Sequence, residues 1–322
     1  MKFKIALAFA VSVMGSPSFS QTAHWPPEQV TIMVPFAAGS TPDIVARIMA
    51  DKFAERTKKT FVVENRPGAG GNLGVAAVAK ASPDGSVIGV GILGGLGLNK
   101  YLMKSMPYDP EKDIAIVTNL VDQPSALAVS NEMGVSTVKE LIEKLQASPG
   151  KFNYASIGQG SLSHLAMELI SNKSGTKVTH LATKSSPEAA MAVIRNDVQM
   201  TVLPLVSVLQ LAEEGKLKML AVTSAQRSTA APQIPTFKEA GVEGVVATAW
   251  MALIAPSATP VSILNVMNSH AVSALNDPVV KEKLSKQVMD VTPMTLEQAK
   301  AYVADEIVKW SAIVKASGIE PQ

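Results

Sequence analysis

Short apolar runs alternate with longer amphipathic stretches along most of this chain. Adjacent apolar residues over four to eight positions predict buried strands, whereas apolar residues three and four positions apart predict helices. The alternation begins with a strand at 30–34, a helix at 42–57, a strand at 61–64 and a helix at 73–81. Parallel strands need crossover connections of about this length, so the pattern predicts parallel β-α units.

The same alternation continues through two sets of elements. We expect further strands at 87–90, 114–120, 125–130, 152–156, 178–181, 198–203, 219–222 and 245–254. We expect further helices at 138–147, 162–171, 187–196, 206–214, 260–276, 278–286 and 296–317. Because the last three helices bring no fresh set of strands, we expect this tail to pack back onto the first set.

That inference predicts a discontinuous first domain, 21–123 plus 245–322, with a second domain, 124–244, inserted into it. Two crossing segments would join the domains and form a hinge that opens and closes around a ligand. The length of 322 residues agrees, because it exceeds what one hydrophobic core usually organises. The composition, with 47% apolar, 17% charged and 5% aromatic residues, is typical of an Ala-rich α/β protein.

The N-terminus has the pattern of an export signal. Lys2 and Lys4 precede an apolar run at 5–14, and small residues follow. We expect residues 1–20 to be a signal peptide cleaved after Ser20, with Ala23 as the alternative, and the mature protein to reach the periplasm. No apolar stretch is long enough to span a bilayer, so we expect no membrane-spanning segment.

Charge and cysteine content exclude several classes of partner and site. The net charge of +2 includes the two lysines of the signal, so the mature chain is near neutral and nucleic acid is not an expected partner. The sequence has no cysteine, which excludes a lipid anchor, disulfides and thiolate metal sites.

A loop of small residues joins the first predicted strand to its helix. The first amides of a helix lack intrahelical partners and lie at the positive end of the helix dipole, so such a loop can bind a carboxylate or phosphate. Thr41 fits the N-cap, Pro42 the first helical position, and Asp43 either complements the dipole or meets a ligand amine or hydroxyl. A tight turn without a ligand is the alternative. The candidate ligand-binding residues are Phe36, Ala37, Ala38, Gly39, Ser40, Thr41 and Asp43.

A second loop of this kind follows the strand at 152–156, and we expect the two loops to face each other across a cleft. Ser161 contacts a carboxylate or simply caps the helix, and His164 is either structural or a general base. The next two strand ends add a hydroxyl cluster at 183–186 and an apolar cleft wall at 203–205. The candidate ligand-binding residues here are Ser156, Gly158, Gly160, Ser161, Ser163, His164, Thr183, Leu203 and Pro204.

The sequence matches no complete enzyme template. Residues 89–94 fit G-x-G-x-x-G, but no convincing helix follows them, so we interpret them as a Gly-rich strand end. G-x-S-x-G, H-E-x-x-H and P-loop motifs are absent, and the four histidines lack metal-ligand spacing. We therefore expect a binding module with no catalytic residue, metal or cofactor. A secreted hydrolase using Ser161 or His164 is the less favoured alternative.

Several motifs spread over nearly the full length carry a family resemblance. The matching stretches are Trp25-Pro26, 34–36 with Gly39 and Asp43, 63–72, 107–110, 149–151 with 153–154, Gly158 with 160–161 and 163–165, 221–224 with 227–228, 235–236 with 239–241, Trp250, 255–256, 259–260 and 309–310. Of these, Asn-Arg-Pro-Gly-Ala-Gly-Gly-Asn at 65–72 is especially specific. With these residues the chain resembles the Bug or TctC family, the extracytoplasmic solute receptors of tripartite tricarboxylate transport systems.

The resemblance implies a two-lobed, type II-like periplasmic binding fold whose first two loops hold a ligand carboxylate, partly through ordered water. It also implies membrane subunits of such a transporter as partners, and we expect the receptor to act as a monomer. A sensory receptor that engages a membrane sensor is the alternative, since the sequence does not separate transport from sensing.

The chain departs from the family pattern where a ligand body would lie. Residues 181–185 replace the frequent Val-Pro-Tyr-Lys-Gly, and 202–204 lack the common Phe-Asp. Loss of a ring and a carboxylate leaves apolar room, so our hypothesis is a carboxylate with an apolar or aromatic body, such as an aromatic mono- or dicarboxylate.

Overall fold

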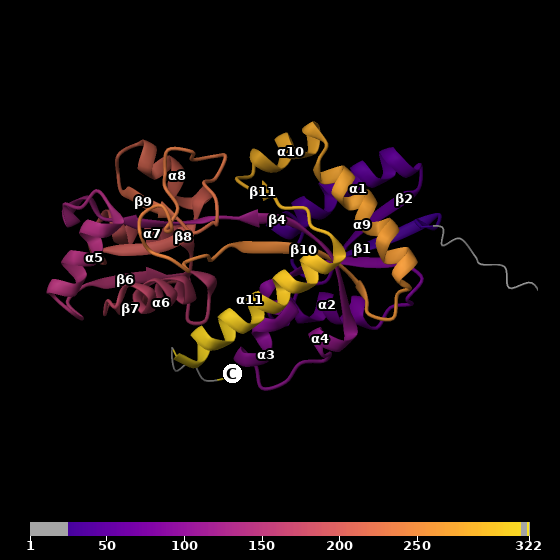
Figure 1. Ribbon diagram of the computed structural model, residues 1–322, viewed down its shortest axis with the longest axis horizontal. Coiled ribbons are helices and arrows are strands. Elements are labelled where there is room, and N and C mark those ends of the chain that lie inside the picture. Colours follow the sequence, from indigo (N-terminus) through magenta and orange to yellow (C-terminus); the bar gives the residue numbers. More distant parts are fainter. Residues whose placement is uncertain (1–24, 317–320, 322) are drawn as a thin grey trace, which may run out of the picture.

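The computed structural model describes residues 25–316 and 321, and it contains a six-stranded and a five-stranded sheet. Figure 1 shows the two sheets in opposite halves of an elongated molecule. We call the half with the six-stranded sheet the first lobe and the half with the five-stranded sheet the second lobe. The predicted signal peptide, 1–20, lies outside the described residues.

The sheet of the first lobe mixes parallel and antiparallel pairs, in the order β11-β4-β10-β3-β1-β2. Its strands are β1 (Gln29–Val34), β2 (Thr60–Asn65), β3 (Val87–Ile92), β4 (Ile114–Gln123), β10 (Ala249–Pro256) and β11 (Asp290–Val291). β1 runs parallel to β2 and β3, as predicted, but β10 is antiparallel to both β3 and β4. The prediction of parallel pairing is therefore correct only for the β-α units at the start of this lobe.

The sheet of the second lobe has the order β7-β6-β8-β5-β9. Its strands are β5 (Ser125–Val129), β6 (Asn153–Ser156), β7 (Thr179–Ala182), β8 (Met200–Pro204) and β9 (Lys218–Val222). β6 is parallel to β7 and β8, whereas β5 is antiparallel to β8 and β9. The strand that enters each sheet from the other lobe, β10 or β5, is thus antiparallel to both of its neighbours.

Helices cover both faces of each sheet. They are α1 (Thr41–Thr57), α2 (Asn72–Ala79), α3 (Asn99–Leu102), α4 (Pro110–Asp113), α5 (Val138–Ala147), α6 (Leu162–Ser174), α7 (Ser186–Ile194), α8 (Leu205–Glu213), α9 (Val261–Leu275), α10 (Pro278–Ser285) and α11 (Leu296–Ala316). In the first lobe α1, α9 and α10 share one core, and in the second lobe α7 and α8 share another. None of these described helices is both long and apolar enough to cross a bilayer.

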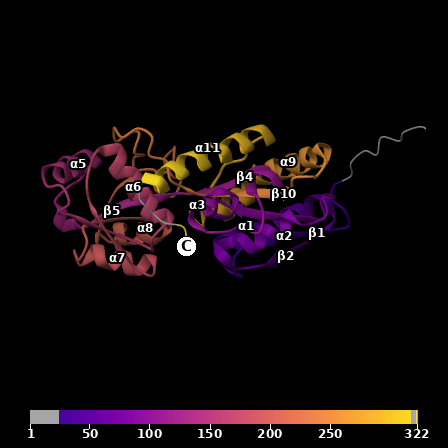
Figure 2. The ribbon, with the colours of Figure 1, turned by 90° about the horizontal axis from the view of Figure 1, so that it is seen from below.

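A third core cluster is continuous between the lobes, because it includes residues of α2, α5, α6 and α11. Figure 2 shows α11 on one face of the molecule, extending from the first lobe toward α6. The predicted two-lobed α/β fold with two crossing segments is confirmed. The tail helices α9 and α10 do pack on α1, but α11 also reaches the second lobe.

Two details of the tail differ from the prediction. The short strand β11 was not expected, and β10 begins at Ala249 rather than 245. The stretch at 245–248 is apolar because it crosses between the lobes while largely buried: Ala247 N–H donates to Thr223 O at 2.9 Å. Its apolar pattern therefore reflects a buried crossing segment without strand pairing.

The crossing segments are fastened to α11 by a buried carboxylate. Glu306 accepts hydrogen bonds from the indole N–H groups of Trp250 and Trp310, at 3.0 and 2.9 Å, and from Lys309 Nζ. Lys309 Nζ also donates to Val246 O at 2.8 Å. Burial, together with the negative charges of Glu306 and Asp290, raises the pKa of nearby Asp122 to about 6. Asp122 lies at one crossing segment, and Val246 and Trp250 lie at the other. Both crossings therefore meet the polar cluster that Glu306 and Lys309 form on α11.

Candidate functional site

The first loop follows β1 and exposes its smallest residues, Ala37, Ala38 and Gly39. Gly39 has φ +80, and a Cβ placed on it would meet no atom within 4 Å. Helix α1 begins at Thr41 with Ser40 as the N-cap and Pro42 at the second helical position. The prediction of Thr41 as N-cap was therefore wrong by one residue, because Ser40 has the extended backbone and its carbonyl accepts the Ile44 N–H at 3.0 Å.

Asp43 organises this loop from within. One carboxylate oxygen accepts from Gly39 N–H at 2.8 Å and Arg47 Nε at 2.9 Å, and the other accepts from Asn65 Nδ2 at 2.9 Å. Burial alone would raise the pKa of Asp43, but the hydrogen bonds from Arg47, Gly39 and Asn65 outweigh it and lower the pKa to about 2. Both oxygens are thus bonded to the protein, which assigns Asp43 to shaping the loop.

These bonds change which amides of the first loop can meet a ligand. The Gly39 N–H is taken by Asp43, and the Ser40 N–H donates to Ala37 O at 3.1 Å. Within the described chain, the N–H groups of Ala37, Ala38 and Thr41 have no partner. Ser40 Oγ is buried and also unpartnered. The donors open to an anion therefore lie on either side of Gly39.

The second loop joins β6 to α6, and Ser161 is the N-cap of α6 as the sequence allowed. Its Oγ accepts from His164 N–H at 3.3 Å and donates to Gly158 O at 2.6 Å, while its own N–H donates to Gly158 O at 3.2 Å. Among the described residues, the amides of Leu162 and Ser163 have no partner outside the helix. The unpartnered amides of this loop thus lie in the first turn of α6.

Four predicted site residues have side chains that face the protein interior. Ser156 is fully buried, Ser163 Oγ donates to Val202 O, and Thr183 Oγ1 donates to Ser156 O at 2.9 Å. Leu203 is 0% exposed and packs in the core beneath α7 and α8, so the prediction that its side chain lines a cleft is wrong. Pro204, at the end of β8, is half-buried. The hydroxyls of Ser156, Ser163 and Thr183 hold the second loop and its flanking strands together.

Two stacked histidine rings lie beneath the second loop. The rings of His164 and His180 are 4.1 Å apart and nearly parallel, at 6°. His164 Nδ1 accepts the Gly160 N–H at 3.0 Å, and His180 Nε2 lies 2.6 Å from Ser156 Oγ. The sequence interpretation did not single out His180, because it lies 24 residues beyond Ser156 and only the pairing of β6 with β7 brings them together.

The hydrogen bonds of this cluster do not form a hydrolytic pair at the predicted positions. The ring of His164 bonds to the loop backbone, and Ser161 Oγ bonds to Gly158 and to the His164 N–H. The serine that does meet a histidine ring is Ser156, which is fully buried. In the described residues, no group of three His, Cys, Asp or Glu side chains is arranged to hold a metal ion.

The two loops border the same part of the first lobe. A Cβ on Gly71 would lie 3.4 Å from the ring of Phe36, and a Cβ on Gly70 would lie 3.0 Å from Met103 Cε. A Cβ on Gly160 of the second loop would lie 3.6 Å from both methyl carbons of Leu102. Residues 69–72 and 99–103 therefore connect the first loop to the second. The sequence interpretation did not place these residues beside the two loops, although it had recognised the motif at 65–72 as specific.

Comparison with known proteins gives full-length similarities. The model of the tripartite tricarboxylate transporter family receptor matches residues 45–319. Protein BugT of Bordetella pertussis is 30% identical over 315 residues, which cover 98% of this chain and 96% of BugT.

Solved structures agree with this comparison. R. palustris Rpa4515 with adipate is 31% identical, with a TM-score of 0.74 over 93% of this chain and 100% of that one. MatC from Rhodopseudomonas palustris with bound malate is 29% identical, with a TM-score of 0.67 over 90% of this chain and 100% of MatC.

Proposed function

Because the chain belongs to the tripartite tricarboxylate transporter receptor family, we propose that it captures a small organic carboxylate in the periplasm and delivers it to the membrane subunits of such a transporter. Members of this family are solute-binding receptors. We propose that this protein, too, binds its solute without turning it over.

The observation that carries the proposal is the pair of strand-to-helix loops with unpartnered amides. The free N–H groups of Ala37, Ala38 and Thr41 and those at the start of α6 are donors that a carboxylate can accept from. Both loops border residues 69–72 and 99–103 of the first lobe. Adipate and malate, the ligands of the two similar structures, are both small dicarboxylates.

We propose that the two lobes close on the ligand. The moving bodies would be residues 21–123 plus 245–322 and residues 124–244, with the hinge at the crossing segments. Thr223 supports this hinge position, because its side chain joins the two crossings: Oγ1 accepts from Ser125 N–H at 3.1 Å and donates to Ala247 O at 2.7 Å.

The body of the ligand is proposed to be apolar or aromatic. The only ionisable side chains in the two loops, 35–43 and 156–164, are those of Asp43 and His164. Asp43 is already bonded to Arg47, and burial lowers the pKa of His164. The loops therefore offer neutral dipoles for one carboxylate and no free charge for further ionic groups. Leu102 beside Gly160 and the exposed side chains of Ile157 and Leu181 add apolar surface.

Calorimetry with terephthalate, benzoate, adipate and citrate tests this function. We expect at least one of the first three acids to bind, with no product formed, and citrate to bind more weakly. At 100 times the dissociation constant, the bound acid should stabilise the protein by about 2.7 kcal/mol in thermal unfolding. Tight citrate binding with no response to the other acids would contradict the proposed ligand class.

Replacing Gly39 with alanine is expected to weaken binding of the responding acid at least about tenfold, since φ +80 is unfavourable for alanine and the loop must shift. Gly134→Ala is the matched control, because Gly134 has φ +63, also has open space around its Cβ position, and follows a turn outside the loops. Both variants should lose about 1 kcal/mol of stability. Equal affinity of the two variants would argue against the first loop as the binding site.

A further inference from the structure

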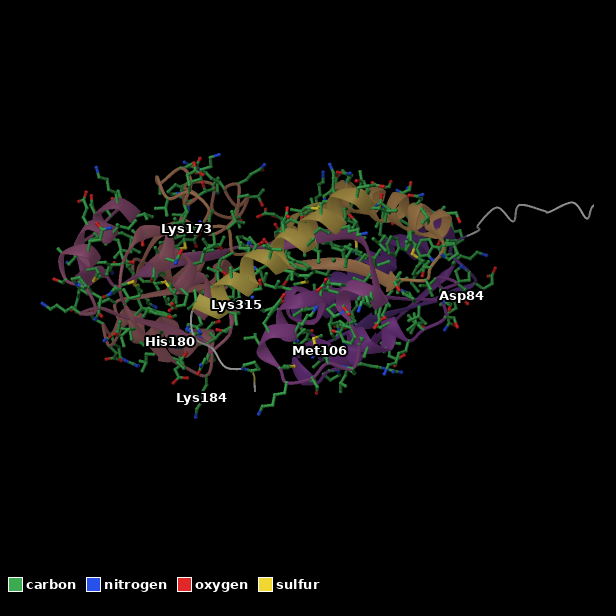
Figure 3. The ribbon with its side chains drawn as sticks, turned by 60° about the horizontal axis from the view of Figure 1, so that its bottom comes forward. Asp84, Met106, Lys173, His180, Lys184 and Lys315 are labelled. Atoms are coloured by element: carbon green, nitrogen blue, oxygen red, sulfur yellow. The ribbon has the colours of Figure 1, made fainter. Side chains whose placement is uncertain are left out.

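His164 and His180 form a polar cluster with Tyr154 and Glu168. Tyr154 of β6 stacks on His180 at 5.0 Å and donates from its hydroxyl to Glu168 Oε1 at 2.7 Å. Glu168 Oε1 also lies 3.9 Å from His164 Nε2. Figure 3 labels His180 in the second lobe, on the side that carries Lys184. The titratable groups that act on the two rings are therefore Glu168, Tyr154 and the rings themselves.

The hydrogen bond to Gly160 fixes the protonation state of His164. A ring nitrogen that accepts an N–H carries no proton, so His164 is neutral and its proton lies on Nε2, toward Glu168. A proton added at Nδ1 would point at the Gly160 N–H, 3.0 Å away. Two donors cannot share that contact, so protonation of His164 breaks one of the bonds that hold the second loop.

His180 supports the same state from the other side of the stack. Its Nε2 meets Ser156 Oγ, which also accepts the Gly158 N–H at 3.1 Å. If both rings were protonated, two positive charges would lie about 4 Å apart and repel each other. Burial lowers the pKa of both histidines, and the charge of His164 lowers that of His180 further, while Glu168 acts in the opposite direction.

We propose that neutral His164, supported by His180, is a positioning residue that keeps the second loop in its binding conformation, and that acid loosens this loop and releases the ligand. The inference rests on the proposed function for its ligand, but the loop change itself needs none. Burial lowers the pKa of His164 in the ordered loop, so the loosened loop takes up the proton more readily and is favoured as pH falls. Affinity should then fall up to about tenfold per pH unit.

Nuclear magnetic resonance of the ligand-free protein tests the loop directly. We expect His164 to be an Nε2–H tautomer at pH 7.5, and the Gly160 amide signal to move with the His164 titration between pH 7.5 and 5. In His164→Asn, whose side-chain oxygen can accept from Gly160 but cannot titrate, that amide should no longer move over this range. A proton on Nδ1 at pH 7.5, or a Gly160 signal that does not change with pH in the natural protein, would overturn the proposal.

A second measurement connects the loop to binding. For terephthalate, or whichever panel acid binds, the dissociation constant at pH 5.5 should be about three to ten times that at pH 7.5. In His164→Asn the ratio should fall below about twofold, whatever the affinity at pH 7.5. His270→Asn is the control, because burial lowers the pKa of His270 as well but its ring packs beside Trp25 in the first lobe. It should keep the full ratio.

An unchanged ratio in His164→Asn would overturn the proposal. If none of the acids binds, the proposed function fails, and the Gly160 titration still decides whether His164 controls the loop.

Discussion

Replacing Glu306 with alanine is expected to lower the free energy of unfolding by about 3–5 kcal/mol, because it leaves several buried donors without an acceptor. The indole N–H groups of Trp250 and Trp310 both point to Glu306 Oε2, and both indoles are almost fully buried. The ammonium of Lys309 would lose its ion pair and keep only Val246 O and the ring of Trp310. Few single changes elsewhere in the described chain remove so many buried partners at once.

Urea unfolding of the variant, followed by tryptophan fluorescence, measures this loss. Glu306→Gln keeps one oxygen acceptor and should lose less. Glu297→Ala is the matched control, since Glu297 lies in the first turn of the same helix and is exposed, and it should change stability by less than about 0.5 kcal/mol. A Glu306→Ala protein within about 1 kcal/mol of the natural one would contradict the role given to this carboxylate.

Replacing Asp43 with alanine is expected to weaken ligand binding by at least about tenfold and to reduce stability by about 2 kcal/mol. The change removes the acceptor of the Gly39 N–H and one acceptor each of Asn65 and Arg47. The first loop then loses the bonds that orient its free amides. Calorimetry with the responding acid and thermal unfolding measure the two effects.

The pH dependence gives an independent check on Asp43. Its pKa is lowered from 3.8 to about 2 in the folded protein, so its stabilisation is complete above about pH 4 and is lost as pH falls toward 2. Asp43→Ala should lack that part of the acid-induced loss. Asp51→Ala, an exposed change on the same helix, should keep it and should bind the ligand normally. Identical acid profiles for Asp43→Ala and the natural protein would refute the assignment.

The sequence allowed the position of both loops to be predicted, because strand, small residues and helix start are adjacent in the chain. Ser161 was recognisable as an N-cap for the same reason. Which amides are free could not be predicted. The set of free amides depends on how the Asp43 carboxylate is oriented, which Asn65, 22 residues further along the chain, helps to fix. From the sequence, Asp43 could equally well have complemented the helix dipole.

Strand directions show the same limit. Parallel pairing of β1 with β2 and β3 follows from local β-α units, but an apolar run carries no information about the direction of its partner. The antiparallel strand β10 and the two-residue strand β11 therefore could not be placed. Leu203 was misassigned because an apolar residue at a strand end fits a core and a cleft wall equally well.

The position of β10 has a consequence for the order of folding. This strand lies between β3 and β4, yet it is formed by residues 249–256, after the whole second lobe. While the chain is being made, the first sheet therefore lacks a central strand until nearly four-fifths of the residues have been synthesised. Such distant pairing slows folding, since loop closure must precede it.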